Sequence, residues 1–225
     1  MTDLPVFTTL LLSRRGRTLT ITLNRPHVLN AFAAVMHIEI IDALRFAATD
    51  EGSDVIVLTG AGRAFSAGGD LARMEECIAN PSEFDREAAD AKRIVFTLLD
   101  MEKPVIAKVN GAAVGLGATI ALLCDVIFAA DTAKIGDPHV KVGLVAGDGG
   151  CVIWPQLIGF ARAKEYLMTG DLIPATKAAE MGLINHAVPA AELDERVDGF
   201  CDRLNAGSVQ AIRWTKTTAN LELKR

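Results

Sequence analysis

The pattern of apolar and polar positions predicts that strands and helices alternate along the chain. Residues 18–23 (TLTITL) alternate threonine with leucine and isoleucine, which is the period of a half-buried strand. The runs 54–59 (DVIVLT) and 105–109 (VIAKV) are almost wholly apolar, as is usual for parallel strands covered on both faces. Further short strands are predicted at 125–129 and 133–136. The pattern therefore predicts an α/β fold with a mainly parallel sheet.

Helical spacing fills the intervals between these strands. Apolar residues recur at three- and four-residue steps from Ala31 to Ala48, and Asn30 is predicted to cap that helix. A helical pattern begins at Leu71, and His37 is expected to be an ordinary surface or packing residue. The remaining helices are predicted at 82–101, 118–124, 150–159, 161–168, 176–182, 190–205 and 208–223.

Length and composition favour one globular domain. The chain has 225 residues, of which 50% are apolar, enough for a substantial core. No linker divides it into independently folding parts. We expect a core over residues 1–190 and a C-terminal helical region over 191–225 that belongs to the same domain.

Charge and hydropathy exclude several function classes. The net charge is −5 and no sustained run of Lys or Arg occurs, so the electrostatic footprint of a nucleic-acid-binding protein is missing. No apolar run reaches the roughly 18 to 20 residues of a membrane-spanning helix. The N-terminal residues MTDLPVF lack a signal-type segment, so we expect a cytoplasmic protein without a membrane partner.

The four cysteines are widely spaced and form no CxxC pair. This spacing argues against a disulfide framework and against a zinc site. Cys124, which follows two leucines, is predicted to be a small buried apolar group. No metal is expected.

Two loops rich in glycine and alanine each follow an apolar strand. They cover residues 60–70 (GAGRAFSAGGD) and 111–117 (GAAVGLG). Right-handed crossovers place such loops at the same edge of a parallel sheet, where each loop could offer a backbone N–H. Two N–H groups aimed at one carbonyl oxygen would stabilise negative charge that develops there. The structural alternative is two independent tight turns with no shared ligand.

Five segments, in this order and spacing, carry a family resemblance. They are LNRPHVLNAF at 23–32, VIVLTGAGRAFSAGGDL at 55–71, KPVIAKVNGAAVGLGATIALLCD at 103–125, AKIGDPHVKVGL at 133–144 and IGFARAKEYLMTGDLIPATKAAEMGLINHAVP at 158–189. Together they resemble the enoyl-CoA hydratase/isomerase, or crotonase, superfamily over nearly the whole chain.

The resemblance implies a crotonase-like spiral of ββα units with C-terminal helices. It also implies an acyl-CoA thioester substrate, with coenzyme A as part of that substrate and no separate cofactor. Members of the superfamily are usually homotrimers or dimers of trimers. They generally continue with a further helical tail beyond the position of Arg225.

By position, the resemblance assigns the thioester oxygen to the backbone amides of Gly69 and Leu116. Leu116 stands where a glycine is usual, which leaves an amide donor in place and alters the shape of the acyl pocket beside it. Further substrate-binding positions are implied at Ala67, Asp70, Leu71, Gly115 and Thr119.

The acid/base positions depart from the superfamily. Hydratases carry one glutamate where this chain has Thr119 and a second where it has His139, so hydration by two glutamates is not implied. Dienoyl isomerases and aryl-CoA dehalogenases place an aspartate at the position of Gly147, whereas Asp148 lies one residue later. The sequence leaves open whether the Asp148 carboxylate points into the site or into solvent.

We expect an enzyme of this family whose exact reaction the sequence leaves open. His139 is a candidate acid/base because imidazole titrates near neutrality, and Asp137 or Asp148 would orient it. The alternatives are that His139 only lines the pocket, that Asp148 is itself the base or nucleophile, or that the protein binds acyl-CoA without catalysis.

Overall fold

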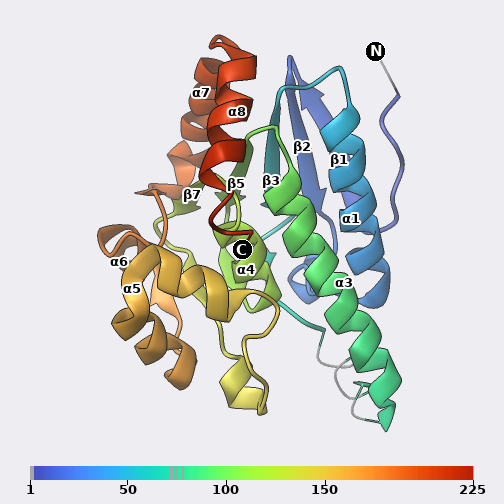
Figure 1. Cartoon of the computed structure of the whole chain (residues 1–225), viewed down its shortest axis with the longest axis vertical. Helices are drawn as coiled ribbons and strands as arrows, with labels where there is room; N and C mark the ends of the chain where they lie inside the picture. The colour runs from blue at the N-terminus through green and yellow to red at the C-terminus, as the bar shows by residue number, and fades with distance from the viewer. Residues whose placement is uncertain (1–2, 71–72, 74–75, 78, 225) are drawn as a thin grey trace.

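The strands form two sheets in the computed structural model, which describes residues 3–70, 73, 76, 77 and 79–224 (Figure 1). In the six-stranded sheet the order is β1-β2-β3-β5-β7-β10. Its strands are β1 (Leu10–Arg15), β2 (Thr18–Leu23), β3 (Val55–Gly60), β5 (Val105–Val109), β7 (Val126–Ala130) and β10 (His186–Val188). Neighbours pair in parallel except β1 with β2, which are antiparallel. The predicted, mainly parallel sheet is therefore confirmed.

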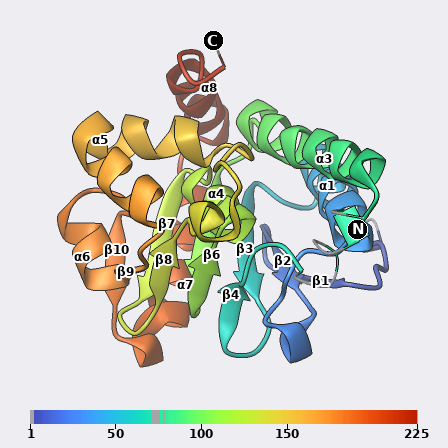
Figure 2. The same ribbon diagram turned by 90° about the horizontal axis from the view of Figure 1, so that it is seen from below.

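A second sheet repeats the order of the first. Its four strands, β4-β6-β8-β9, are β4 (Ala64–Ser66), β6 (Ala112–Val114), β8 (Lys134–Gly136) and β9 (Ile173–Pro174). Each consecutive pair, β3 with β4, β5 with β6 and β7 with β8, gives one strand to each sheet, and Figure 2 shows β4, β6 and β8 side by side. This repetition is the spiral of ββα units that the resemblance implies.

Helices cover the large sheet and surround the small one. They are α1 (Ala34–Thr49), α3 (Pro81–Asp100), α4 (Leu116–Leu122), α5 (Gly150–Thr169), α6 (Ala175–Glu180), α7 (Leu193–Asn205) and α8 (Val209–Ala219). Short 3-10 helices lie at Pro26–Val28, His139–Val142 and Ala190–Glu192. Helices α1 and α3 lie side by side in both views, and α7 packs on β3, β5 and β7.

The core lies between the large sheet and its helices. Strand β3 is buried at every residue, and the side chains of Phe32, Phe65 and Trp154 are among the largest that are fully buried. Cys124 is buried as predicted, and the thiols of all four cysteines are free. Among the described residues, no helix is both long enough and apolar enough to cross a bilayer.

The prediction that Asn30 caps a helix is wrong. Helix α1 begins at Ala34 and has Ala33 as its N-cap, without a side-chain cap. Asn30 instead adopts a positive φ of 57°, a conformation that asparagine tolerates better than most residues. Its side-chain amide donates to the carbonyls of Ala61 and Ala64 at 2.9 and 2.8 Å. Asn30 therefore fixes the loop between β3 and β4.

Other predicted elements have shifted boundaries. The Gly/Ala stretch after β5 contains the short strand β6. The helix that follows, α4, begins at Leu116, two residues before its predicted start. The helices predicted at 150–159 and 161–168 are one element, α5, interrupted at Gly159 by a positive φ of 77°. Strand β1 was not predicted from the sequence. The pattern beginning at Leu71 lies partly outside the described residues.

Candidate active site

The two loops rich in glycine are in direct contact. Strands β4 and β6 are parallel neighbours, which brings together the segments that follow them. Gly68 has a φ of +87°, and a Cβ there would lie 2.7 Å from the carbonyl oxygen of Val114. A Cβ on Gly117 would lie 2.6 Å from the Cβ of Ser66. Only glycine permits this approach, so the predicted adjacency of the two loops is confirmed.

The backbone amides of Gly69 and Leu116 both lack an acceptor among the described residues. Gly69 forms a β-bridge with Phe32, but the residues on either side of Gly69 make its hydrogen bonds. The Gly68 carbonyl accepts from the Phe32 amide, and the Asp70 amide donates to the Phe32 carbonyl. Leu116 is the first residue of α4, a position whose N–H has no partner within a helix. Within the part of the chain that the structure describes, neither amide donates a hydrogen bond. Both are available to a ligand.

A pocket opens at the junction of these loops. It brings together four residues that the sequence singled out, Ala67, Gly69, Gly115 and His139. Leu116, which follows Gly115, is buried beside it. The other residues that line the pocket are Gly68, Val114, Pro138, Lys141 and Val142.

The carboxylate of Asp148 points inward. Its side chain is only 12% exposed, and its Oδ1 accepts a hydrogen bond of 3.2 Å from the hydroxyl of Thr119, which is fully buried on α4. Its Oδ2 lies 3.7 Å from Nε2 of His139. Asp148 therefore lies between Thr119 and His139.

Asp137 holds the opposite side of the His139 ring. Nδ1 of His139 makes a short hydrogen bond to Oδ1 of Asp137, which also accepts from the His139 backbone amide at 3.4 Å. The Asp137 side chain is fully buried, and its Oδ2 has no hydrogen-bond partner among the described residues. Both aspartates considered from the sequence thus contact the imidazole, on different nitrogens.

The pKa values of His139 and Asp148 are both raised, for different reasons. The hydrogen bond that His139 donates to Asp137 raises the pKa of His139 above its ordinary value, although burial opposes this rise and the charge of Asp148 adds to it. Burial raises the pKa of Asp148, opposed by the charge of His139 and the hydrogen bond from Thr119. The site therefore retains protons more readily than the same groups do in water.

The same three residues satisfy the spacing of a metal site. One ligand atom each from Asp137, His139 and Asp148 lies within 4.8 Å of the others. However, Oδ1 of Asp137 is already engaged by Nδ1 and by the backbone amide of His139. We therefore describe the cluster as an imidazole held in a hydrogen bond by one carboxylate and faced by a second.

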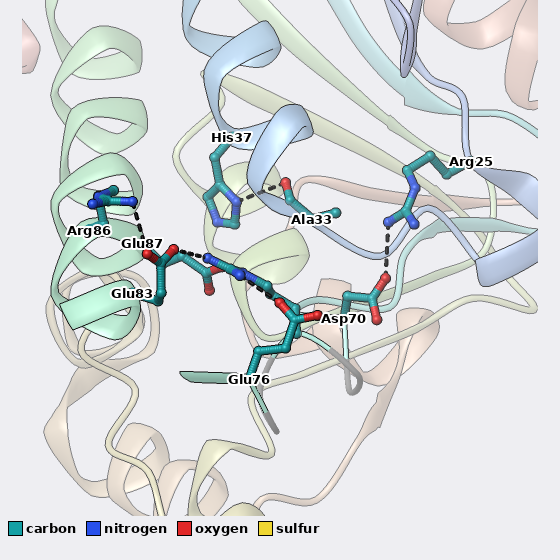
Figure 3. A network of polar contacts seen from close by, with 9 residues as sticks. Arg25, Ala33, His37, Asp70, Glu76, Glu83, Arg86 and Glu87 are labelled. Carbon is teal, nitrogen blue, oxygen red and sulfur yellow. Dashed lines mark hydrogen bonds and ion pairs between the residues drawn. The ribbon is translucent and has the colours of Figure 1, made fainter. Parts of the chain in front are cut away.

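The segment that leaves the first loop is anchored by ion pairs. Asp70 pairs with Arg25 at 3.2 Å, as Figure 3 shows, and does not line the pocket, whereas Leu71 lies outside the described residues. Further along, Arg73 bonds the carboxylates of Glu83 and Glu87 on α3 at 2.6 and 2.5 Å. Asp70 is thus held by Arg25, and Arg73 by α3.

Two asparagines whose site roles the sequence did not reveal hold the first loop in shape. Asn30 bonds the carbonyls of that loop, and Asn110 accepts from the Gly60 amide at 3.2 Å and donates to the Gly62 carbonyl at 2.9 Å. The sequence signal that could have revealed the role of Asn110 is the Asn-Gly pair it forms with Gly111 directly after β5, because such pairs mark tight turns.

Comparison with known proteins gives a consistent result. The sequence profile of the enoyl-CoA hydratase/isomerase family matches residues 14–225. A crotonyl-CoA hydratase of Syntrophomonas wolfei is 36% identical over 213 residues, which are 94% of this chain and 81% of that protein. A trans-2-decenoyl-[acyl-carrier-protein] isomerase of Streptococcus mutans is 33% identical over 199 residues, covering 88% of this chain and 76% of that protein.

The crystal structure of an enoyl-CoA hydratase/isomerase from Mycobacterium paratuberculosis superimposes with a TM-score of 0.93 at 37% identity, covering 100% of this chain and 88% of that chain. The two-sheet spiral and the match along nearly the whole sequence agree. The chain belongs to the enoyl-CoA hydratase/isomerase family and has the crotonase fold.

Proposed function

We propose that the protein is an acyl-CoA enzyme that stabilises a thioester enolate with the backbone amides of Gly69 and Leu116. The observation that carries this proposal is the direct contact of the two loops beside one pocket, where neither amide has an acceptor in the described part of the chain. Donors fixed in a site with little water stabilise charge that develops on an oxygen without having to reorganise. A polarised thioester carbonyl acidifies the adjacent Cα, which makes proton transfer there accessible.

Asp148 and His139 supply the acid/base chemistry in this proposal. His139 lines the pocket, Asp148 faces His139 at 3.7 Å, and the pKa values of both groups are raised. Asp148 removes a proton from Cα, and the C–H electron pair moves to the thioester oxygen between the two amides. Hydration and double-bond isomerisation both pass through this intermediate, and the relatives include a named hydratase and a named isomerase.

The direct test is turnover over a panel of enoyl-, hydroxyacyl- and malonyl-type CoA esters. We expect turnover with at least one of these classes, and a large fall in kcat for His139→Gln with little change in affinity for the ester. Unchanged turnover in His139→Gln would remove His139 from the mechanism. A wild-type protein that neither turns over nor binds any CoA ester would overturn the proposal.

A second candidate is an acyl-CoA-binding protein without catalysis. It is favoured by the presence of Thr119 and His139 at the two positions where hydratases carry glutamate. Tight binding of CoA esters by calorimetry together with no turnover over the whole panel would support it.

We also propose assembly into homotrimers or dimers of trimers in the cytoplasm. Large apolar side chains are exposed on α5 and on the turn before it, as expected of a surface that meets another copy. Val145 is 76% exposed, Phe160 69% and Met168 68%. Light scattering on the purified protein tests the assembly, and a monomer at micromolar concentration would contradict it.

A further inference from the structure

The imidazole of His139 is held from two sides by carboxylates that have different surroundings. Asp137 is fully buried and bonds Nδ1, whereas Asp148 faces Nε2 at 3.7 Å and also contacts Thr119. His139 itself lines the pocket and is 15% exposed at its side chain. The ring therefore connects a carboxylate in the core to one at the site.

The hydrogen bond to Asp137 determines which nitrogen of the His139 ring carries the proton. A carboxylate only accepts, so Nδ1 must be the donor in this contact. In the neutral ring the lone pair then lies on Nε2, the nitrogen that faces Asp148. The backbone amide of His139 donates to the same Asp137 oxygen at 3.4 Å, which fixes the carboxylate relative to the main chain of that turn.

The packing around Asp137 leaves it little freedom to move. A Cβ on Gly150, the first residue of α5, would lie 2.4 Å from Oδ2 of Asp137, so the carboxylate lies against the backbone of that helix. Negative charge is favoured at a helix N-terminus. Asp137 is thus held by packing on one side and bonds His139 on the other.

We propose that Asp137 is a positioning residue that fixes His139 in the Nδ1–H form, so that Nε2 and the carboxylate of Asp148 hold one exchangeable proton between them. In one form the proton is on Oδ2 of Asp148 and the Nε2 lone pair faces it. In the other the proton is on Nε2 and the carboxylate is ionised. His139 can therefore also hold a proton that Asp148 takes from the substrate.

The catalytic part of this inference rests on the proposed acyl-CoA chemistry, whereas the tautomer of His139 does not. Long-range ¹H–¹⁵N NMR spectra of the histidine rings read the tautomer directly, with His139→Gln assigning the signals. We expect the Nδ1–H form of His139 in the wild-type protein at pH values where the ring is neutral. A neutral Nε2–H form would overturn the proposal, whether or not the protein has activity.

Asp137→Asn tests the catalytic part, because the amide preserves size and removes the charge. We expect kcat to fall by about 10²- to 10⁴-fold, the usual share of a positioned acid/base group, with KM changed by less than about 3-fold. The acid limb of the kcat profile should move to lower pH, because His139 must be neutral at Nε2 to take the proton and Asp137 raises the pKa of His139. Asp148 is the other charged group acting on the ring, while Lys141 of the same turn pairs with Asp171.

A double-mutant cycle separates positioning from mere structural support. If Asp137 acts through His139, then Asp137→Asn in the His139→Gln background should lower kcat no further. Asp42→Asn on α1, whose side chain is 54% exposed, is the matched control and should change nothing. Additive losses, or an unmoved pH profile in an active Asp137→Asn protein, would overturn the positioning role and leave the acyl-CoA proposal intact.

Discussion

The hydroxyl of Thr119 donates a 3.2 Å hydrogen bond to the carboxylate of Asp148. Thr119 lies on α4 and Asp148 in the loop before α5, so this bond joins the loop to the helix. The hydrogen bond also stabilises the ionised form of Asp148 and opposes the effect of burial on its pKa.

Removal of this hydrogen bond should impair the base. Thr119→Val keeps the shape of the side chain, and we expect kcat to fall by about 10- to 100-fold, since a hydrogen bond to a charged group contributes about 1.5–3 kcal/mol. The acid limb of the kcat profile should move to higher pH because the pKa of Asp148 rises further. Thr119→Ser, which keeps the hydroxyl, is the control, and equal losses in both variants would show that only packing had changed.

The Leu116 amide offers a second test, because proline removes an N–H and little else at the first position of a helix. We expect Leu116→Pro to lower kcat by about 10²- to 10³-fold, the usual effect of losing one donor to an oxyanion. Leu116→Ala loses the same side chain but keeps the amide, so its kcat should stay within about 10-fold of wild type. Steady-state kinetics on both proteins decide the matter. Similar values for the two variants would show that the amide has no part in turnover.

Contact between the two loops can be disturbed without touching any donor. In Gly117→Ala the new Cβ would lie 2.6 Å from that of Ser66, so the loops must separate. We expect a fall in kcat of at least about 10-fold, because small misplacements of catalytic groups are costly. Gly199→Ala on α7 meets nothing within 4 Å and should raise stability by about 0.5–1 kcal/mol with unchanged kcat. Full activity in Gly117→Ala would contradict the role given to this contact.

Helix α8 depends on a buried lysine. Lys216 has a 7% exposed side chain, and its Nζ bonds Asp125 at 2.8 Å and the Lys103 carbonyl at 2.9 Å. Lys216→Met leaves Asp125 without its ion-pair partner. We therefore expect the free energy of unfolding to fall by about 3–5 kcal/mol. Lys224→Met breaks the more exposed pair with Asp100 and should cost less than about 1 kcal/mol. Urea denaturation measures both values, and equal small losses would refute a structural role for Lys216.

The sequence predicted most of the fold because local periodicity and parallel topology dominate it. The buried runs that became β3 and β5 need two covered faces, and the loops after them must meet at one sheet edge. Asn30 escaped prediction because a cap and a left-handed turn use the same residue types. Only tertiary contacts with the carbonyls of Ala61 and Ala64 select the turn.

The acid/base group was harder to predict for a different reason. Asp148 lies in a loop between Gly147 and Gly149, and Gly149 has a φ of 119°. Glycine backbones permit many directions for the side chain between them. Contacts distant in sequence decide where the Asp148 side chain points. The Thr119 hydroxyl bonds its carboxylate, and the Thr119 methyl lies so near Gly149 that a Cβ there would approach it to 2.9 Å.

In the proposed chemistry, two backbone amides and Asp148 make the Cα proton of a bound acyl-CoA labile. Exchange of the α-protons of butyryl-CoA into D₂O, followed by ¹H NMR, tests it without presupposing the net reaction. We predict exchange with the wild-type protein, a loss of about 10²- to 10⁴-fold in Asp148→Asn, and no loss in Asp42→Asn. Binding of butyryl-CoA without any α-proton exchange, or equal exchange in Asp148→Asn, would contradict the account.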